Sequence, residues 1–427
     1  MEICKQISDG THFTPNYVEE GIPFISVKDV RPYRIDFSNT KYISKKEAKI
    51  LDKRCKPQFN DILLTKIGAT FGFASIVDTY DEFQIFVSLA LLRPDINKVN
   101  PEFLEIFLNT RLSYLQFARI IKGAGVPDLH LEDIRKTQIV LPEIDEQKNI
   151  VTFFKEQLNK KISIDKKAND ILNNIEDYLL LELGITPPSE PENTLENRIF
   201  NSDFTETLGN RLDPFYHQKY FEAIDEVILN SKFKKSVTKL RNCLSFIESG
   251  SRPSGGVKNI EEGVLSFGGE HVNWLGQIEV NTPKYIPEKY HKSHRLTHTK
   301  MHDVLIVKDG ATTGKIGIIT NPEHVDQNIN EHVFLLRFTN LNPFFATYLL
   351  NTSLFQKAIK RQITGATVTG LTKQALKSIL IPVPDMDTQN SLVEIISQKR
   401  QEAFRLMEEA EKEFEKAKQE VEKMILE

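Results

Sequence analysis

The chain repeats itself, and this internal repeat constrains the fold more than any single motif does. The two halves match at a constant offset of 242 residues, which separates Asp61 from Asp303 and Gly68 from Gly310. Matches at this offset pair DIL with DVL, GATFG with GATTG, NPEFLEIFLNT with NPFFATYLLNT, GAGVPDL with GATVTGL, and Pro142 and Gln147 with Pro384 and Gln389. Because so many identities share one register, the chain is a tandem duplication, and both halves are predicted to share one scaffold.

Some segments of the two halves do not repeat. Residues 8–34 read SDGTHFTPNYVEEGIPFISVKDVRPYR, whereas residues 248–274, at the corresponding place, read ESGSRPSGGVKNIEEGVLSFGGEHVNW. Two copies of one scaffold that carry different surface loops are expected if each copy reads a different target.

Each half is predicted to be a mixed α+β domain. Short apolar runs such as IPFISV, DILLTKIG, FGFASIV and SLALLRP are punctuated by Gly, Pro and Asp, which is typical of strands. The run NPEFLEIFLNTRLSYLQFARII places proline in a first turn and then shows helical spacing of apolar residues. We expect the two domains at residues 1–143 and 211–386.

A long charged helix is predicted after each domain, at residues 144–184 and 387–427, with a polar linker at residues 185–210. Apolar residues follow heptad spacing in both helices, which is typical of a coiled coil. The first helix carries Val151, Leu158, Leu172 and Leu179 in one row and Phe154, Ala168 and Ile175 in the other, interrupted by Lys161, Asp165 and Glu182. The second carries Val393, Met407, Phe414 and Val421 beside Ile396, Ala403, Ala410, Ala417 and Met424, interrupted only by Arg400.

Neither helix could bury its apolar stripe alone, so we expect the two to pack against each other. Because a pseudo-twofold axis relates the halves, the predicted packing is antiparallel. Forty residues of helix would make a rod of about 60 Å. The predicted fold is therefore α+β, with two tandem domains separated by two antiparallel coiled-coil helices.

Composition excludes several classes of protein. With 40% hydrophobic and 27% charged residues, the chain is neither disordered nor a membrane protein. The opening MEICKQISDG lacks the apolar core of a signal peptide, so we expect a cytoplasmic protein. The three cysteines include no CxxC pair. The net charge of −4 is unusual for a nucleic-acid binder, but a basic face can coexist with acidic helices.

Motifs of catalysis and metal binding are incomplete. GATTGKI at Gly310 is one residue shorter than a P-loop and ends in Ile316 instead of Ser or Thr, so a glycine-permitted turn is expected. NPFF at Asn342 is similar to a methyltransferase motif, but its twin NPEF at Asn100 indicates a helix start. DLHLEDIR, residues 128–135, carries carboxylates without a nuclease-like lysine arrangement. These observations favour a chain without catalytic residues.

Four histidines lie close together in the second half. They are His291, His294, His298 and His302, and the last three are spaced as on one helix face. The glutamate of an HExxH motif is absent, and the corresponding SKKEAKILDKRCKPQ of the first half contains no histidine. We therefore predict no metal site, and expect a solvated helix face or contacts with a DNA backbone.

The order of these features resembles the specificity subunit of type I restriction-modification systems. Each half holds KYI, then DIL or DVL, then a glycine pair, and closes with LPEIDEQKNIV or VPDMDTQNSLV before a long helix. NRLDPFYHQKY, which precedes the second domain, resembles the usual interdomain segment of that family. The resemblance covers nearly the whole chain.

The resemblance implies a non-catalytic DNA-reading subunit. Each domain would be a target recognition domain for one half of a split, asymmetric site in double-stranded DNA, and the helices would set the unread spacer. Two adenine methyltransferase subunits, which bind S-adenosylmethionine, would dock on the helices and domain flanks. Endonuclease/translocase subunits that use ATP and Mg would complete the complex. This chain itself would bind no cofactor, no metal and no membrane.

Base reading needs polar and basic side chains on loops that face a DNA groove. In the first half the candidates are Ser8, Thr11, His12, Lys28, Arg31, Arg34 and Lys66. In the second half they are Ser251, Arg252, Ser254, His271, Asn273, Trp274, Lys308, Thr312 and Lys315. Gly68, Gly72, Gly310 and Gly314 are expected at structural turns.

Two other functions remain alternatives. A stand-alone DNA-binding regulator would need tight binding without partners, which the net negative charge disfavours because such binding relies on phosphate neutralisation. A self-contained modification enzyme would need the catalytic motifs that are missing from the sequence.

Overall fold

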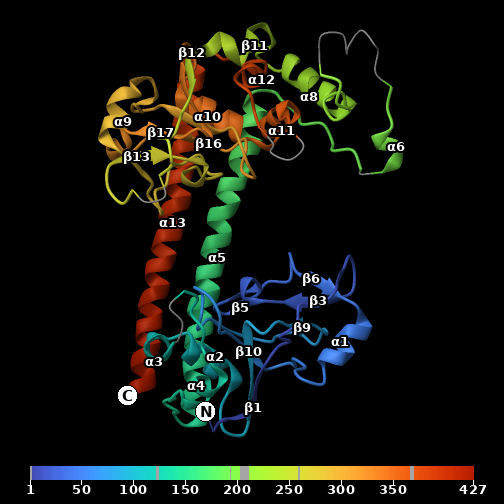
Figure 1. Ribbon diagram of the computed structural model, residues 1–427, viewed down its shortest axis with the longest axis vertical. Coiled ribbons are helices and arrows are strands. Elements are labelled where there is room, and N and C mark those ends of the chain that lie inside the picture. The colour runs from blue at the N-terminus through green and yellow to red at the C-terminus, as the bar shows by residue number, and fades with distance from the viewer. Residues whose placement is uncertain (1, 122–124, 193, 202–210, 258–259, 366–369) are drawn as a thin grey trace. The chain divides into compact units, whose positions relative to one another are not determined.

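The structure is a computed structural model that describes residues 2–121, 125–192, 194–201, 211–257, 260–365 and 370–427 (Figure 1). Parts of GAGVPDL and GATVTGL, and of the predicted linker, therefore lie outside the described residues, as does the first residue of NRLDPFYHQKY. The chain divides into a first unit, residues 1–166 with 405–427, and a second unit, residues 167–404. Each unit thus contains one domain and a part of both long helices.

The first unit is built on a four-stranded antiparallel sheet in the order β1-β10-β7-β8. Its strands are β1 (Cys4–Asp9), β7 (Ile62–Thr65), β8 (Ala74–Ile76) and β10 (Leu89–Pro94). The apolar run ILLT forms β7 and is buried along its whole length. Helices α2 (Pro101–Leu108) and α3 (Arg111–Ile120) follow β10, and α2 packs on β8. Asn100 caps α2 and Pro101 occupies its first turn, as NPEF predicts.

A second sheet in the first unit carries most of the segment that does not repeat. Its order is β2-β6-β3-β9, and β3 pairs with β9 in parallel. The elements of this region are β2 (Tyr17–Val18), β3 (Ile22–Ile25), β4 (Val30–Arg31), β5 (Arg34–Ile35), β6 (Lys41–Ile43), α1 (Lys45–Leu51) and β9 (Gln84–Ile85). Helix α4 (Leu131–Lys136) follows α3 in the chain and packs on β1.

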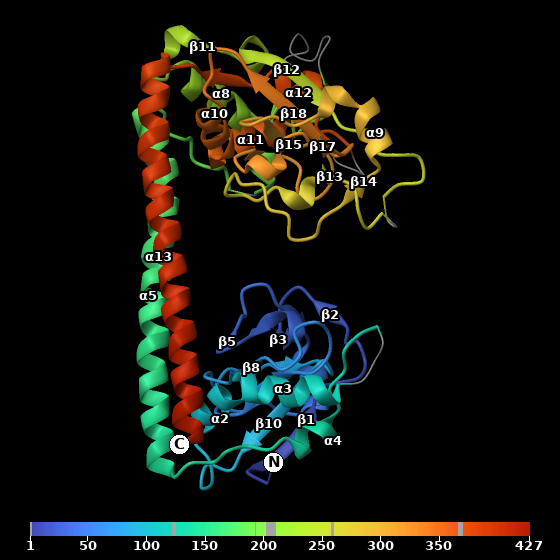
Figure 2. The ribbon, with the colours of Figure 1, turned by 90° about the vertical axis from the view of Figure 1, so that its left-hand side faces the viewer.

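The second unit repeats this plan. Its four-stranded sheet has the order β12-β18-β15-β16, and β13 pairs with β17 in parallel beside β14. Its strands are β11 (Val237–Lys239), β12 (Leu244–Ser249), β13 (Val264–Phe267), β14 (Tyr285–Ile286), β15 (Val304–Val307), β16 (Ile316–Ile318), β17 (Asn328–Ile329), β18 (Val333–Phe338) and β19 (Leu380–Pro382). Its helices include α8 (Lys219–Leu229), α9 (Glu288–Ser293), α10 (Pro343–Asn351), α11 (Ser353–Gln362) and α12 (Lys373–Lys377) (Figure 2). A short α6 (Leu195–Arg198) precedes α8 (Figure 1).

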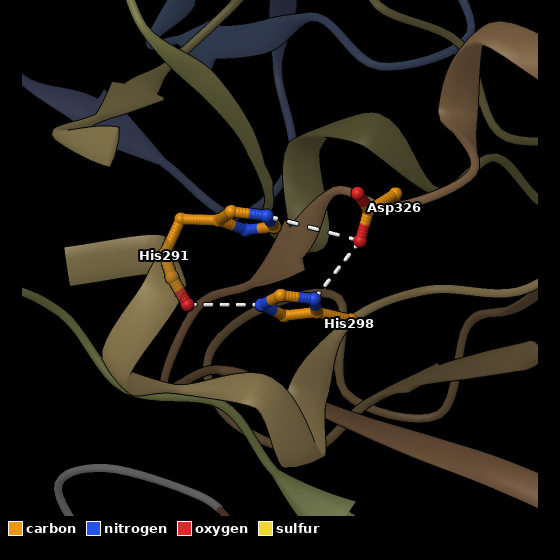
Figure 3. Close-up of side chains that lie close together, drawn as sticks. All are labelled: His291, His298 and Asp326. Carbon is orange, nitrogen blue, oxygen red and sulfur yellow. Dashed lines mark hydrogen bonds and ion pairs between the residues drawn. The ribbon is translucent and has the colours of Figure 1, made fainter. Parts of the chain in front are cut away.

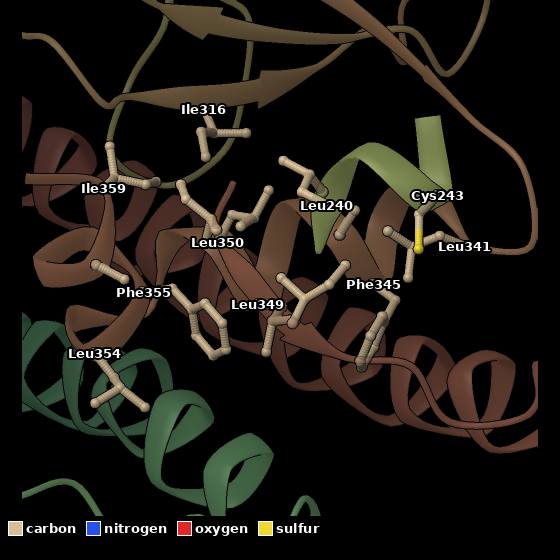
Figure 4. Packing of buried hydrophobic residues seen from close by; sticks show 14 of the residues in the cluster. Leu240, Cys243, Ile316, Leu341, Phe345, Leu349, Leu350, Leu354, Phe355 and Ile359 are labelled. Atoms are coloured by element: carbon tan, nitrogen blue, oxygen red, sulfur yellow. The ribbon is translucent and has the colours of Figure 1, made fainter. Parts of the chain in front are cut away.

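The core of the second unit lies between this sheet and its helices. Phe345 and Leu349 of α10 and Phe355 of α11 are fully buried, and they belong to one apolar cluster with Ile316 of β16 (Figure 4). Burying each such side chain contributes roughly 1.5–3 kcal/mol. The glycine-rich segment GATTGKI forms the predicted turn between β15 and β16, because Gly310 and Gly314 adopt φ values of 89° and 101°.

The two long helices are α5 (Ile144–Glu182) and α13 (Met386–Leu426). In the first unit the start of α5 packs on the end of α13, where the rings of Phe154 and Phe414 lie 5.5 Å apart. In the second unit the end of α5 packs on the start of α13, since Leu179 shares a buried cluster with Ile396. The pairing is antiparallel in each unit, as expected from the pseudo-twofold relation of the two halves. The α+β fold with an internal repeat is confirmed.

Partners surround three of the polar residues that interrupt the heptads, namely Lys161, Asp165 and Arg400. The Lys161 ammonium lies 2.6 Å from Asp165 and 3.2 Å from Glu411 of α13. Arg400 lies over the rings of Tyr348 and Phe404 and donates a 2.5 Å hydrogen bond to the Leu275 carbonyl. Burial lowers the pKa of Arg400, and these rings and the carbonyl hold its guanidinium in place.

Candidate nucleic-acid interface

The most concentrated candidate surface of the second unit surrounds Trp274, whose side chain is 54% exposed. The Lys315 ammonium lies 5.6 Å from the centre of the Trp274 ring. Asn273 shapes this loop, because its Oδ1 accepts hydrogen bonds from the backbone N–H groups of Leu275 and Gln277 at 3.0 and 2.9 Å. Because Arg400 also holds the Leu275 carbonyl, the Trp274 ring is presented on an ordered loop.

A groove beside this ring combines aromatic, basic and backbone groups. We call it the Trp274 groove, and its lining includes Trp274, Gly310, Thr313, Gln356, Lys357 and Lys360. Burial alone would lower the pKa of Lys357, but hydrogen bonds to Glu190 and Tyr220 outweigh it and raise that pKa. Lys357 therefore stays a cation. Lysines can neutralise phosphates, and a glycine turn lets the backbone approach a ligand.

A chain of polar contacts connects two other candidates of the second unit. Lys308 lies 2.6 Å from Asp309, which also lies 3.5 Å from a ring nitrogen of His332. The other ring nitrogen of His332 lies 3.4 Å from Glu331, and Glu331 pairs with Arg252 at 3.0 Å. The Arg252 side chain is 65% exposed, so it is available to a ligand, whereas Lys308 is largely covered.

Lys66 of the first unit is the counterpart of Lys308 in the repeat, and it is buried. Its ammonium lies 3.7 Å from Asp9 and 3.8 Å from Asp128. The buried Asp9 also pairs with Arg54 at 2.5 Å and with His12 at 3.3 Å. The structure therefore brings His12 and Lys66 together around one carboxylate, with His12 exposed to solvent and Lys66 covered.

The remaining candidates of the first unit fall into two groups. Lys28, Arg31 and Arg34 are exposed on and beside the β4–β5 hairpin. Ser8 and Thr11 are less accessible: the Ser8 hydroxyl lies 3.6 Å from the Cys55 sulfur, and Thr11 is buried. The hairpin is therefore the most accessible basic segment among the candidates of this unit.

The remaining candidates of the second unit differ in exposure. Ser254 is exposed, Thr312 is half-buried, and Ser251 accepts a 2.7 Å hydrogen bond from the Tyr290 hydroxyl. His271 is buried, and its ring nitrogens contact the Gly268 N–H at 2.9 Å and the Thr282 carbonyl at 3.0 Å. The ring of His271 thus holds its own loop together. Contact of these residues with DNA stays a prediction.

Sequence reasoning did not identify several basic residues of these surfaces. Arg54 pairs with Asp9 across 45 residues of sequence, and no local pattern indicates that contact. Lys357 and Lys360 lie three residues apart on the amphipathic helix α11, which is a signal that could have identified them. Arg400 interrupts a heptad, and that interruption was the only indication of its role.

The histidine cluster differs from its prediction. Helix α9 ends at Ser293, and His302 has a φ of 67°, so His294, His298 and His302 do not share a helix face. Instead His291 and His298 lie beside Asp326, and among the described residues this is a group whose ligand atoms lie close enough to hold a metal ion.

Among the described residues, none of the helices combines the length and the apolar character that crossing a membrane requires.

The family comparison and two curated relatives agree on one family. The type I restriction modification DNA specificity domain matches residues 2–174 and 232–416, which is most of both halves. The specificity subunit of the type I restriction enzyme EcoBI of Escherichia coli is 30% identical over 166 residues, which cover 38% of this chain and 35% of that protein. The match therefore spans about a third of that relative.

Other relatives match over nearly their full length. The MjaVIII specificity subunit of Methanocaldococcus jannaschii is 22% identical over 420 residues, which cover 96% of this chain and 89% of that protein. A solved type I restriction-modification assembly contains a chain that is 16% identical to this one, with a TM-score of 0.48 and coverage of 99% and 94%. The S subunit of M. genitalium, also solved, is 12% identical with a TM-score of 0.40 and coverage of 98% and 93%.

Proposed function

Since this chain belongs to the type I restriction modification DNA specificity family, we propose that it selects a bipartite site in double-stranded DNA for an adenine methyltransferase and an endonuclease. Each half would read one half-site, and the helices α5 and α13 would set the unread spacer. S-adenosylmethionine would bind to two methyltransferase subunits, and ATP and Mg to the endonuclease subunits. The chain itself would contribute recognition and no catalytic group, as a cytoplasmic component of a restriction-modification complex.

One observation carries this proposal. The two halves share a sheet order, a parallel strand pair and their helix caps, but residues 8–34 and 248–274 carry different polar side chains. A repeated framework with unlike loops suits an asymmetric target, because each copy can present its own donors and acceptors to base edges.

The accessible basic groups of each unit support the same proposal. The Trp274 groove offers two lysines and a glycine turn, and Lys315 lies beside its aromatic ring. The β4–β5 hairpin of the first unit offers Arg31 and Arg34. Such groups would contact phosphates for position and base edges for specificity, in spite of the net charge of −4 for the whole chain.

Co-expression with the adenine methyltransferase of the same system tests the proposal. We expect the chain to copurify with that subunit, and the complex to methylate adenines at a site made of two short sequences with an unread gap. A double substitution, Lys315→Ala with Lys360→Ala, should weaken DNA binding by the complex at least tenfold. Lys235→Ala, which changes an exposed lysine outside the Trp274 groove, is the matched control and should retain affinity.

Two results would contradict the proposal. One is methylation of a continuous site that does not depend on this chain. The other is tight, sequence-selective DNA binding by the isolated chain with no association to the methyltransferase, which would favour a stand-alone regulator.

A further inference from the structure

Two histidine rings and a carboxylate converge in the second unit (Figure 3). His291 lies in the last turn of α9, His298 follows the short helix at Arg295–Thr297, and Asp326 lies two residues before β17. His298 Nδ1 is 2.9 Å from Asp326 Oδ1, and His291 Nε2 is 3.8 Å from the same oxygen. The two rings stack in parallel with centres 3.7 Å apart, and one nitrogen of each ring faces the carboxylate.

The neighbours of His291 fix where its hydrogen lies. The Asn328 amide nitrogen donates to Thr297 Oγ1 at 3.0 Å and faces the His294 carbonyl at 3.4 Å, so Asn328 Oδ1 must be the atom that faces His291. That oxygen can only accept, and it contacts His291 Nδ1. Nδ1 therefore carries the hydrogen, and the lone pair of the neutral ring lies on Nε2, toward Asp326.

A hydrogen bond also fixes the tautomer of the His298 ring. Its Nε2 lies 2.9 Å from the His291 carbonyl, which can only accept, so Nε2 carries the hydrogen. The lone pair of the neutral ring then lies on Nδ1, again toward Asp326. Outer hydrogen bonds that set the tautomer and orientation of both imidazoles are typical of metal-binding histidines.

Asp326 supplies a charged and accessible third ligand. Its side chain is 72% exposed, whereas those of His291 and His298 are 11% and 18% exposed. Its φ of 57° lies in the left-handed region, and its N–H donates to the Thr299 carbonyl at 2.8 Å, so a strained backbone aims this carboxylate at the rings. Arg337 donates to the His298 carbonyl, but Asp303 neutralises its charge.

We propose that His291 Nε2, His298 Nδ1 and Asp326 form a binding site for a divalent transition metal such as Zn²⁺. Two ligand atoms of a tetrahedral zinc lie roughly 3.4 Å apart, because each is about 2.1 Å from the metal. The observed separations of 2.9 and 3.8 Å bracket that value, and all three ligand atoms lie within 4.8 Å of one another. Because the stacked rings lie in parallel planes, metal binding would rotate them so that both lone pairs converge on the ion. The exposure of Asp326 leaves a fourth position open to solvent, and the metal would tie α9 to the segment before β17.

In the first unit a lysine ammonium occupies the place that corresponds to the proposed metal site. Gln84 of β9 and Asn328 of β17 are equivalent, because β3–β9 and β13–β17 are the matching parallel pairs. Two residues earlier, Glu82 takes the position of Asp326. The Lys56 ammonium lies 3.3 Å from both Glu82 and Asp52. A lysine thus balances the carboxylate in one half, where a bound metal would do so in the other.

Titration of the full chain with Zn²⁺ tests the site, after removal of metal with a chelator and with a competing chromophoric chelator in solution. We expect one tight equivalent per chain, and a rise in the midpoint of thermal unfolding. Co²⁺ should give the visible absorption bands of a tetrahedral site. Asp326→Asn should lower the Zn²⁺ affinity 10-fold to 100-fold, because asparagine tolerates the left-handed backbone but lacks the charge.

Matched variants separate this site from adventitious binding. His298→Gln should also abolish the Co²⁺ bands, whereas Glu82→Gln, the equivalent change in the first unit, should leave Zn²⁺ affinity unchanged. No saturable binding would overturn the site, since a His298 ring with hydrogens on both nitrogens would then explain its contacts. Binding that is equally tight in wild type, Asp326→Asn and His298→Gln would overturn it as well.

Discussion

Equivalent ion pairs and hydrogen bonds hold the frameworks of the two units together, whereas their surface loops carry different polar residues. Arg93 pairs with the buried Asp61 at 2.7 Å in the first unit, and Arg337 pairs with the buried Asp303 at 2.7 Å in the second. In both units a glutamine at the start of the long helix accepts from the capping asparagine N–H at 2.8 Å. Framework hydrogen bonds have thus kept their register through the duplication, whereas the loops have not.

In each unit a different long helix caps the start of the equivalent short helix. The Arg111 N–H, at the start of α3, donates to Glu422 of α13. The equivalent Ser353 N–H, at the start of α11, donates to Glu176 of α5 at 2.9 Å. The same helix end is therefore capped by opposite helices, as a pseudo-twofold relation requires. The comparison shows that the coiled coil is part of both cores.

Breaking the buried Arg–Asp pair of a unit should have the largest effect on the stability of that unit. Arg337→Met leaves Asp303 buried without its partner, and we expect a loss of about 3–5 kcal/mol in the free energy of unfolding of the second unit. Arg93→Met should cost a similar amount in the first unit. Calorimetry of the two variants should show a different transition lowered in each, and an equal loss in both transitions would contradict the assignment of one pair to each core.

A buried glutamate distinguishes the two units by pH. Burial raises the pKa of Glu105 from 4.5 to about 7, whereas the equivalent residue of the second unit is Thr347. The folded first unit therefore holds a proton that the unfolded chain releases, and its stability should fall by about 3 kcal/mol as pH rises from 4.5 through 7.

Glu105→Gln should remove this pH dependence, because the amide oxygen can still accept from the Ile76 N–H. Chemical denaturation at pH 5 and pH 8 measures the difference. Thr347→Ser is the control in the second unit and should leave the pH profile unchanged. A wild-type first unit that is equally stable at both pH values would show that Glu105 is not protonated in the folded state.

Lysines of the Trp274 groove should affect DNA binding more modestly. In complex with its methyltransferase, Lys360→Gln is expected to weaken binding by about 1 kcal/mol and to lower the slope of log affinity against log salt by about one. Equilibrium titrations at several salt concentrations give both values. An unchanged salt slope would place Lys360 outside the DNA interface.

The smallest expected effect is at the exchanged helix caps. Glu422→Gln and Glu176→Gln each remove a negative charge from a helix N-terminus, which is worth about 0.3–1 kcal/mol. We expect Glu422→Gln to destabilise the first unit and Glu176→Gln the second, as measured by hydrogen exchange of the α3 and α11 amides. Destabilisation of the other unit in either case would contradict the pseudo-twofold exchange.

Local sequence patterns predicted the repeated framework well. Strands, helix starts and the coiled coil follow from apolar spacing and from Asn-Pro capping, which act over a few residues. The candidate nucleic-acid interface and the proposed metal site depend on contacts between distant residues, which no local sequence pattern encodes. Lys66 was predicted to face a groove but is buried between Asp9 and Asp128, which are 57 and 62 residues away in the sequence. His298 meets Asp326 because the neighbouring Thr299 exchanges backbone hydrogen bonds with Asp326 and Gln327, which lie 27 and 28 residues further along the chain.

The central claim is that each half reads its own part of the DNA site. Mapping of methylated adenines in cells that carry wild type, Arg31→Ala or Arg252→Ala, each with the methyltransferase subunit, tests it most directly. We predict that Arg31→Ala relaxes one half-site and Arg252→Ala the other, at about 1–3 kcal/mol per lost base contact. Equal relaxation of both half-sites by either variant would contradict the claim.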